Sequence, residues 1–304
     1  MEAYLGIDVG SITAKFVLLD NDDAIVARRY LLTEGLPATA VCRGLKEIEK
    51  SMPVNTDIKG VAVTGSARHL AGAIVGADMI KNEITCQAVA AIDYMPDVRT
   101  VIEIGGQDSK LIIIRDGMVT DFGMNTVCAA GTGSFLDHQA ARLNISIGEF
   151  SRQALRGDSS VSIAGRCTVF AESDMVHKQQ MGSRPEDIIY GLCRALVRNY
   201  LSDVASGKDI QSPVVFQGGV AFNHGIIRAL GEALDVEIIV PPGHEVMGAV
   251  GAALLVHENV TGNGAASRFR GFDIDENDCE ALPCERSACP ESCRTTGLSS
   301  DGYG

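Results

Sequence analysis

The sequence predicts an α/β protein built from two related domains that face each other across a cleft. Three observations lead to this prediction. Short apolar runs typical of strands alternate with segments of helical periodicity, turn residues separate the runs, and one hairpin pattern occurs twice along the chain. With 304 residues, of which 46% are hydrophobic, the chain is long and apolar enough for one large or two ordinary domains.

The first 122 residues are expected to contain two three-stranded meanders joined by helices and a strand. Apolar runs predict the strands of the first meander at 4–8, 15–20 and 24–32. A helix at 37–51, a buried strand at 61–64 and a helix at 82–95 are expected next. The second meander is predicted at 100–104, 109–115 and 118–122, with Asp116 and Gly117 as a hairpin turn.

The rest of the chain is expected to be mostly helical before an irregular end. Helices are predicted at 132–144, 146–156, 168–181, 185–206, 220–234 and 245–257, with strands at 214–217 and 236–240. From Asn259 onward the sequence has little periodicity and contains many Gly, Ser and Asp residues. We therefore predict a first domain at 1–97, completed by the helix at 245–258, a second domain at 98–244, and an acidic tail at 259–304.

The two meanders begin with the same pattern. Asp8-Val9-Gly10 aligns with Glu103-Ile104-Gly105 at an offset of 95 residues (103 minus 8), and the same offset pairs Lys15 with Lys110. Each copy is an apolar strand, an acidic residue, a glycine turn and a returning strand. Two hairpins with glycine turns can also look alike by chance, so duplication and coincidence are the alternatives at this point.

Each hairpin turn carries residue types that suit a nucleotide phosphate. Glycine and hydroxyl residues between two strands let consecutive backbone N–H groups converge on one point. Carboxylates at the strand ends, Asp8 and Glu103, suit Mg²⁺ held largely through waters, and Gln107 has the chemistry to orient an attacking water. Residues predicted to contact the nucleotide are Gly10, Ser11, Thr13, Lys15, Gly105, Gly106, Asp108, Ser109 and Lys110, with Gly218 and Gly219 expected beneath the adenosine.

The order of these elements resembles a known superfamily. The chain has no G-x-x-x-x-G-K-[ST] sequence, so a Walker-type phosphate loop is excluded. The two hairpins and the later glycine pair resemble the phosphate-1, phosphate-2 and adenosine elements of the sugar kinase, heat-shock chaperone and actin superfamily. This resemblance implies two duplicated actin-like ATPase domains of ribonuclease H-like fold around an ATP cleft.

Two of the nine cysteines, Cys128 and Cys167, stand just before predicted helix starts. A thiolate at a helix N-terminus is stabilised by unpaired N–H groups and by the helix dipole, and it therefore ligates metals well. For either cysteine alone, a small buried residue is the alternative. Cys42, Cys86 and Cys193 lie within predicted helices and are expected to be packing residues.

The sequences that follow these two cysteines resemble a narrower family. The segment that starts at Cys128 reads C-A-A-G-T-G-S-F-L, and the segment that starts at Cys167 reads C-T-V-F-A-E-S-D. Both resemble the activator ATPases of 2-hydroxyacyl-CoA dehydratases and the related benzoyl-CoA reductase subunits, which form the BadF/BadG/BcrA/BcrD type of ATPase. The resemblance covers roughly residues 3–257. It implies that Cys128 and Cys167 bind a 4Fe–4S cluster shared between two subunits.

Several expectations follow from this resemblance. Such a cluster takes four thiolates and one chain offers two, so a two-fold homodimer with one cluster is implied. The implied activity is ATP hydrolysis, with ATP and ADP as ligands and Mg²⁺ as cofactor, coupled to one-electron transfer at low potential. Reduced ferredoxin or flavodoxin is the implied donor, and a dehydratase-type Fe–S protein is the implied acceptor.

Two other functional classes remain open at this stage. A small-molecule kinase of the same fold would need no iron–sulfur cluster, and a nucleotide-dependent scaffold or sensor would need no turnover. The tail cysteines, Cys279, Cys284, Cys289 and Cys293, do not match the spacing of zinc ribbons or ferredoxins. They form either a second metal site, a loosely docked tail or a disulfide after air exposure.

Composition excludes some classes of partner and compartment. The formal net charge is −13 and no run of clustered Lys and Arg occurs, which argues against a nucleic-acid partner. The apolar stretch at 246–256 is only 11 residues long, too short to cross a bilayer. No basic segment precedes the short apolar stretch at the N-terminus, so no signal peptide is predicted. A cytoplasmic protein without a membrane partner is therefore expected.

Overall fold

The computed structural model describes residues 1–125, 129–158, 160–164, 167–263 and 266–274. Contacts divide the chain into two compact units. Unit 1 contains Met1–Asn82 and the described residues from Gly248 onward, and unit 2 contains Glu83–Met247. Each unit is built on a five-stranded mixed sheet with helices on its faces, which confirms the predicted α/β class. The domain limits predicted at residues 97 and 259 stay a prediction.

The sheet of unit 1 joins an antiparallel meander to two parallel strands. The meander consists of β1 (Glu2–Val9), β2 (Thr13–Leu19) and β3 (Ile25–Leu32), as predicted. β4 (Asp57–Thr64) and the short β5 (Met79–Ile80) run parallel to β1 on its other side. The strand order is therefore β3-β2-β1-β4-β5, with β1 in the centre.

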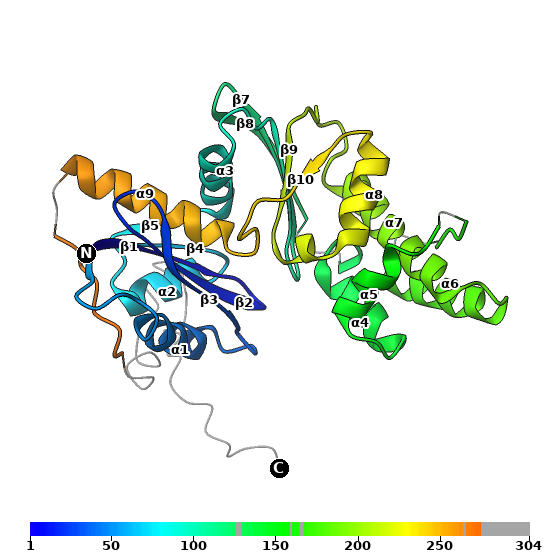
Figure 1. Cartoon of the computed structure of the whole chain (residues 1–304), viewed down its shortest axis with the longest axis horizontal. Helices are drawn as coiled ribbons and strands as arrows, with labels where there is room; N and C mark the ends of the chain where they lie inside the picture. Colours follow the sequence, from blue (N-terminus) through cyan, green and yellow to red (C-terminus); the bar gives the residue numbers. More distant parts are fainter. Residues whose placement is uncertain (126–128, 159, 165–166, 264–265, 275–304) are drawn as a thin grey trace, which may run out of the picture. The chain divides into compact units, whose positions relative to one another are not determined.

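Successive side chains of β1 point to opposite faces of this sheet. The odd-numbered side chains of β1 join one core with α1 (Pro37–Glu49) and α2 (Arg68–Val75). On the other face, a Cβ atom at Gly6 would collide with the Ala249 carbonyl of α9 (Met247–Asn263). α9 therefore packs directly on the backbone of β1, and Figure 1 shows it on the side of the sheet opposite α1.

The sheet of unit 2 repeats this plan. β6 (Thr100–Ile104), β7 (Ser109–Arg115) and β8 (Met118–Asn125) form the antiparallel meander. β9 (Val214–Gln217) and β10 (Ile238–Ile239) add parallel strands, which gives the order β10-β9-β6-β7-β8. The predicted hairpin turn is confirmed, because Asp116 and Gly117 adopt positive φ angles of 51° and 72°.

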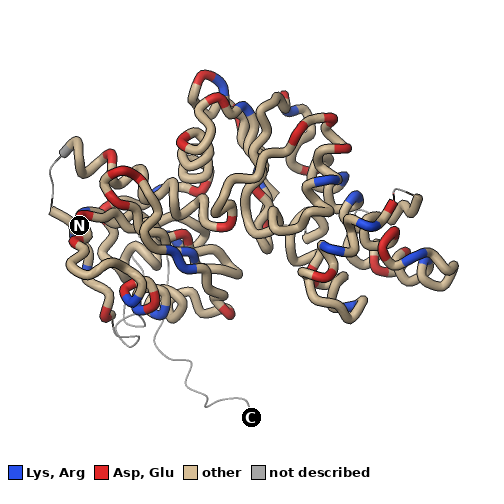
Figure 2. Tube along the Cα trace, viewed as in Figure 1, with Lys and Arg blue, Asp and Glu red and all other residues tan. Residues whose placement is uncertain are grey.

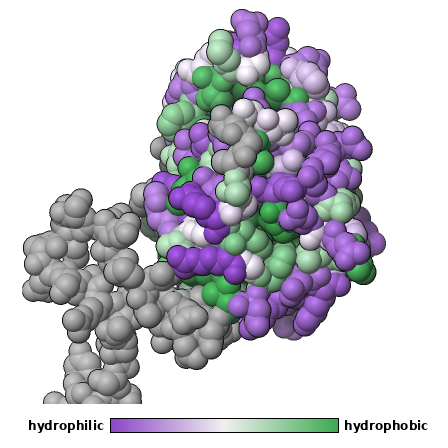
Figure 3. Space-filling model, turned by 90° about the vertical axis from the view of Figure 1, so that its left-hand side faces the viewer, coloured by the Kyte–Doolittle hydropathy of each residue, from purple (hydrophilic) through white to green (hydrophobic). Residues whose placement is uncertain are grey.

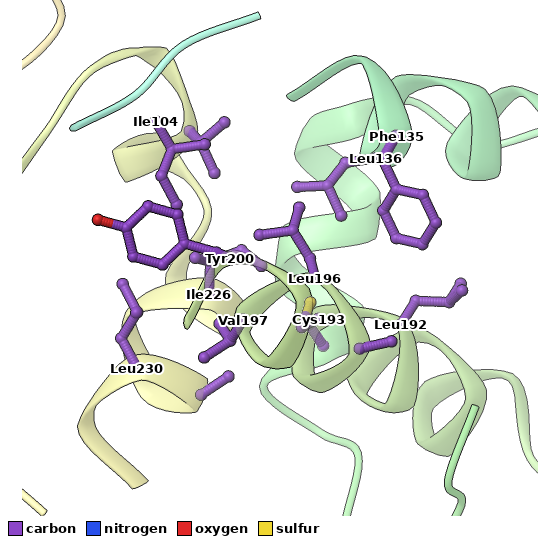
Figure 4. Close-up of a cluster of buried hydrophobic side chains, with 14 of the residues drawn as sticks. Ile104, Phe135, Leu136, Leu192, Cys193, Leu196, Val197, Tyr200, Ile226 and Leu230 are labelled. Atoms are coloured by element: carbon purple, nitrogen blue, oxygen red, sulfur yellow. The ribbon is translucent and has the colours of Figure 1, made fainter. Parts of the chain in front are cut away.

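Helices cover both faces of this second sheet. α3 (Glu83–Tyr94) packs on one face through Ala88 and Ala91. The larger core on the other face includes side chains of α4 (Gly133–Arg142), α5 (Ile147–Ala154), α6 (Thr168–Gln180), α7 (Pro185–Asp203) and α8 (His224–Leu234). Figure 4 shows buried side chains of α7 between those of α4 and α8.

The segment after α9 packs on unit 1. The Ser267 hydroxyl donates to a carboxylate oxygen of Asp78 (2.6 Å), and the Arg268 N–H donates to the other oxygen (2.7 Å). Phe269 and Phe272 pack against the core of α1, α2 and the sheet. Residues 266–274 therefore tie the end of the described chain to the region around β5.

Charged and apolar side chains are mixed over the surface. Figure 2 shows acidic and basic residues interspersed along both units. On the face drawn in Figure 3, hydrophilic and hydrophobic residues alternate over small areas. Among the described helices, none combines the length and apolar character that a membrane crossing requires.

Candidate nucleotide-binding hairpins and cysteine sites

The first hairpin presents its predicted residues around the end of β1. Asp8 is buried, lies opposite Lys15 in the β1–β2 register, and pairs with its ammonium group at 3.1 Å. The Gly10 N–H donates to the Thr13 carbonyl at 2.9 Å, which closes the turn. Ser11 at the tip is exposed, and its carbonyl accepts a hydrogen bond from the Thr33 hydroxyl.

The second hairpin repeats these contacts at equivalent positions. Glu103 is buried opposite Lys110 and pairs with it at 2.9 Å. The Gly105 N–H donates to the Asp108 carbonyl at 3.0 Å, as Gly10 does to Thr13 in the first hairpin. Because the same strand pairing, turn hydrogen bond and carboxylate–lysine pair occur at the offset of 95 residues, the structure favours duplication over chance likeness.

Lys110 differs from Lys15 in its surroundings. It is only 2% exposed, and its Nζ lies 2.8–2.9 Å from carboxylate oxygens of Glu83, Glu103 and Asp108. Burial disfavours the ammonium form, but the three carboxylates outweigh burial and hold the pKa of Lys110 above its usual value. Lys110 therefore keeps its charge and neutralises carboxylates that would otherwise repel one another.

The remaining residues of the second turn differ in how far solvent can reach them. Gln107 is exposed, and Gly105 and Gly106 are partly exposed, so a ligand can reach this part of the turn. Ser109 is fully buried, and its hydroxyl has no hydrogen-bond partner among the described residues.

The predicted glycine pair lies beside the second hairpin. β9 runs parallel to β6 with Gln217 opposite Glu103, so Gly218 follows at the same edge of the sheet. Gly218 has a φ of +95°, and a Cβ there would lie 2.5 Å from the Ile104 carbonyl oxygen. Only glycine fits this close approach without strain. The structure thus brings the second hairpin and the glycine pair together within unit 2.

Four further residues belong to these sites but were not among the predicted site residues. In unit 2, Glu83 reaches Lys110 from the first turn of α3. His244 accepts the Gly218 N–H through its carbonyl (2.8 Å), and its Nδ1 lies 3.0 Å from the Gly218 carbonyl. In unit 1, Thr64 lies opposite Asp8 in the β1–β4 register and is followed by Gly65. The Thr64 hydroxyl is buried with no hydrogen-bond partner among the described residues.

Gly65 tolerates no side chain. Its φ is +99°, and a Cβ would collide with the Val9 carbonyl and lie 2.7 Å from Asp8 Oδ1. We expect Gly65→Ala to lower the free energy of unfolding by about 3–5 kcal/mol, because backbone strain and overpacking add together. Gly35→Ala is the matched control, since Gly35 has a φ of +80° with nothing within 4 Å of its Cβ position. The control should lose only about 1–2 kcal/mol in urea unfolding. Equal losses would contradict a steric role for Gly65.

The predicted cysteine ligands are described only in part. Cys167 is exposed and is the N-cap residue of α6, directly before the first helical residue. Cys128 and the four tail cysteines lie outside the described residues. Cys42, Cys86 and Cys193 are buried in α1, α3 and α7, which confirms the prediction that they are packing residues. Burial also raises the pKa of the Cys193 thiol.

The described residues contain no group of three or more His, Cys, Asp or Glu side chains arranged to hold a metal ion. A metal group that takes two ligands from each of two chains would not produce such a group in one chain. The donor set that can be examined is the exposed Cys167 thiol at a helix N-terminus. An exposed thiol is a sulfur ligand of the kind that iron–sulfur clusters take, so Cys167 fits ligation of iron.

Comparisons with known proteins agree with this geometry. The model of the BadF/BadG/BcrA/BcrD ATPase family matches residues 5–256. The (R)-2-hydroxyglutaryl-CoA dehydratase activating ATPase of Acidaminococcus fermentans is 37% identical over 255 residues, covering 84% of this chain and 96% of the relative. The crystal structure of component A of that dehydratase superposes with a TM-score of 0.80 at 36% identity, covering 86% of this chain and all of the other.

A second solved structure was determined with a nucleotide analogue. It is the activator of the 2-hydroxyisocaproyl-CoA dehydratase from Clostridium difficile with bound ADPNP. Its TM-score is 0.79 at 34% identity, and the match covers 86% of this chain and 97% of the other.

Proposed function

This chain belongs to the BadF/BadG/BcrA/BcrD ATPase family, and from that premise we propose that it is an ATP-dependent one-electron donor that activates a partner enzyme. The proposed acceptor is a 2-hydroxyacyl-CoA dehydratase-type or related Fe–S protein, and the proposed donor is a reduced ferredoxin or flavodoxin. The observation that carries the proposal is the repeated hairpin, with its glycine turn bond and buried carboxylate–lysine pair, in a chain closely related to dehydratase activators.

In this proposal the hairpins bind the phosphates of ATP. The exposed turn residues Ser11 and Gln107 follow Gly10 and Gly106, which carry no Cβ of their own to block the approach of a phosphate oxygen. Asp8 and Glu103 are buried at the strand ends, where each would accept hydrogen bonds from the waters of a bound Mg²⁺. The hydrolytic water would be oriented by the Gln107 amide.

The adenosine would rest on the glycine pair of unit 2. Gly218 and Gly219 would supply backbone for this contact, and the His244–Gly218 hydrogen bonds fix the position of Gly218. The missing Cβ of Gly218 allows the close approach to the Ile104 carbonyl, and the missing Cβ of Gly219 would leave room for the sugar and base. Binding energy from this contact would hold the triphosphate in line with the second hairpin.

The proposed electron site consists of Cys128 and Cys167 from each of two subunits. Four thiolates are the ligand set of a 4Fe–4S cluster, which supplies reversible one-electron chemistry when bound. Next to Cys167, Val169 and Phe170 are 66% and 68% exposed on α6. A homodimer joined near this helix would cover these two neighbouring apolar side chains.

Metal analysis of the anaerobically purified protein tests this proposal directly. We expect about four irons per two chains, the stoichiometry of one shared 4Fe–4S cluster, together with slow ATP hydrolysis. Mixing with an oxidised dehydratase-type partner, a reduced ferredoxin and ATP should reduce the partner, and omission of ATP should prevent this. Iron-free protein that still phosphorylates a small molecule would instead indicate a kinase of the same fold.

A further inference from the structure

The described segment after α9, residues 266–274, is bound along the turn that joins α2 to β5, and we call it the strap. The Arg270 N–H donates to the Val75 carbonyl at 3.0 Å, which gives a partner to one of the last carbonyls of α2. At the next position of the turn, a Cβ at Gly76 would collide with the Arg268 carbonyl, so the two backbones are in contact here. The strap therefore closes the C-terminal end of α2.

The Asp78 carboxylate joins the strap to the sheet of unit 1. Its Oδ2 accepts hydrogen bonds from the Val61 N–H of β4 (2.9 Å) and from the Ser267 hydroxyl (2.6 Å), and its Oδ1 accepts one from the Arg268 N–H (2.7 Å). The Arg268 guanidinium also donates to the Ala77 carbonyl at 2.7 Å. Because hydrogen bonds to a carboxylate are among the stronger ones, these donors hold the strap, the turn and β4 together at one point.

Two aromatic side chains anchor the strap on the apolar core of unit 1. Phe269 and Phe272 are half-buried and contact each other edge to face, with ring centroids 5.0 Å apart. Both pack against the core to which α2 contributes Ala71, Ile74 and Val75. An aromatic ring removes a large apolar area from water when it packs on a core. Loss of both rings should therefore release the strap from α2.

The other end of α2 is bonded to the strand that leads into the first hairpin. The Ala67 N–H, directly before α2, donates to the Val9 carbonyl at 2.9 Å, and the Arg68 N–H donates to the Gly65 carbonyl at 3.2 Å. Val9 precedes Gly10, with which the candidate phosphate-binding turn begins. α2 has eight residues and no side chain that caps its N-terminus, and helices this short are not stable on their own. Its position therefore depends on its packing and on what holds its two ends.

We propose that the strap is a positioning element that holds α2 against the first hairpin and so tightens nucleotide binding by unit 1. The inference rests on the proposed function, because it requires a nucleotide at the first hairpin. A rigid element that is bonded at both ends carries energetic coupling between them, and α2 is such an element, with the strap at one end and Val9 at the other. The strap lies beyond residues 5–256, which the family model matches, so the family match does not include this contact.

Phe269→Ala combined with Phe272→Ala tests the proposal in the full-length protein. Titration calorimetry with Mg²⁺ and ADPNP measures both the dissociation constant and the number of sites per chain. We expect the dissociation constant to rise about 5-fold or more, with the number of sites unchanged. Partial unfolding would instead lower the number of sites and leave their affinity at the wild-type value. Amide hydrogen exchange in α2, measured without nucleotide, should become faster in this variant.

Lys46→Ala is the matched control, because Lys46 reaches the strap only through an exposed pair with Asp273 at 3.7 Å. It should change neither the dissociation constant nor the exchange in α2. Ser267→Ala is the milder second variant, since it removes one donor from Asp78 and leaves both aromatic rings in place. It should raise the dissociation constant in the same direction by a smaller factor.

The outcomes separate this inference from the proposed function. A wild-type protein that does not bind ADPNP would defeat the proposed function and the inference with it. Faster exchange in α2 with a wild-type dissociation constant would overturn the inference alone, and so would unchanged exchange in the double variant. Fewer sites of wild-type affinity would also overturn it, because the strap would then serve folding. If the double variant does not fold, the dissociation constant of Ser267→Ala decides, and an unchanged value overturns the inference.

Discussion

Cys167→Ala is expected to remove the bound iron and to leave ADPNP binding unchanged. Cys167 is exposed, and its side chain makes no capping hydrogen bond to α6, so its loss should barely affect the stability of the fold. If the thiolate is one of four ligands shared between two subunits, each dimer loses two of them at once. Two remaining thiolates are too few to hold a 4Fe–4S cluster.

The measurement is iron per chain after anaerobic purification, with ADPNP binding measured on the same sample. Cys193→Ala serves as the control, because Cys193 is a buried cysteine of the α7 core and should be able to lose its thiol without loss of iron. The same variant series should show the Cys167→Ala protein eluting as a monomer if the shared group joins the dimer. Retention of wild-type iron by Cys167→Ala would refute the assignment of this residue.

Sequence periodicity predicted the sheets and the longer helices, because their signals are local. The six meander strands are apolar runs that end at turn residues, and both meanders form as expected. α2 and β5 were not predicted. α2 has only eight residues and no side chain that caps its N-terminus, and it ends at Gly76 with a φ of +69°. β5 is a two-residue edge strand. Two residues cannot show a period, and α2 lacks the N-cap side chain that Ser146 supplies to the equally short α5.

One helix was predicted in the wrong place for a local reason. The expected helix at 220–234 is a 3₁₀ turn, η2 (Gly219–Phe222), followed by α8 from His224. Asn223 separates them, since its side chain accepts hydrogen bonds from the N–H groups of Gly225 and Ile226. Asparagine is a strong N-cap residue, and an Asn followed by an apolar periodic segment was the available signal.

The missed site residues depend on contacts that only the fold creates. Glu83 lies 27 positions before Lys110 in the sequence (110 minus 83), and its carboxylate reaches the lysine because α3 begins beside β6 and β7. Thr64 lies opposite Asp8 because β4 pairs in parallel with β1. A rule that neighbouring parallel strands end at the same edge could have suggested Thr64 and Gly65, whereas nothing local in the sequence pointed to Glu83.

Lys110→Met is expected to destabilise the protein strongly while preserving the shape of the side chain. It removes the ammonium group that lies within 2.9 Å of three carboxylates, of which Glu103 is almost fully buried. Removing one partner from a buried ionic group leaves uncompensated charge and typically costs about 3–5 kcal/mol. The raised pKa of Lys110 means that its stabilising charge is fully present below its unfolded pKa of 10.5 and is lost only above that value. The wild-type contribution should therefore be constant from about pH 6 to pH 9.

The variant should behave differently as the pH changes. Acid protonates the carboxylates that Lys110 no longer neutralises, and their mutual repulsion then falls. The difference in unfolding free energy between wild type and Lys110→Met should thus be larger at pH 8 than at pH 5, measured by urea denaturation. Lys59→Met is the control, because Lys59 also pairs with two carboxylates, Glu2 and Asp57, but at the exposed surface, where solvent screens the charges. A loss for Lys110→Met as small as that for Lys59→Met would mean that the three carboxylates tolerate one another without a counter-charge. The second hairpin would then need some other explanation for its buried lysine.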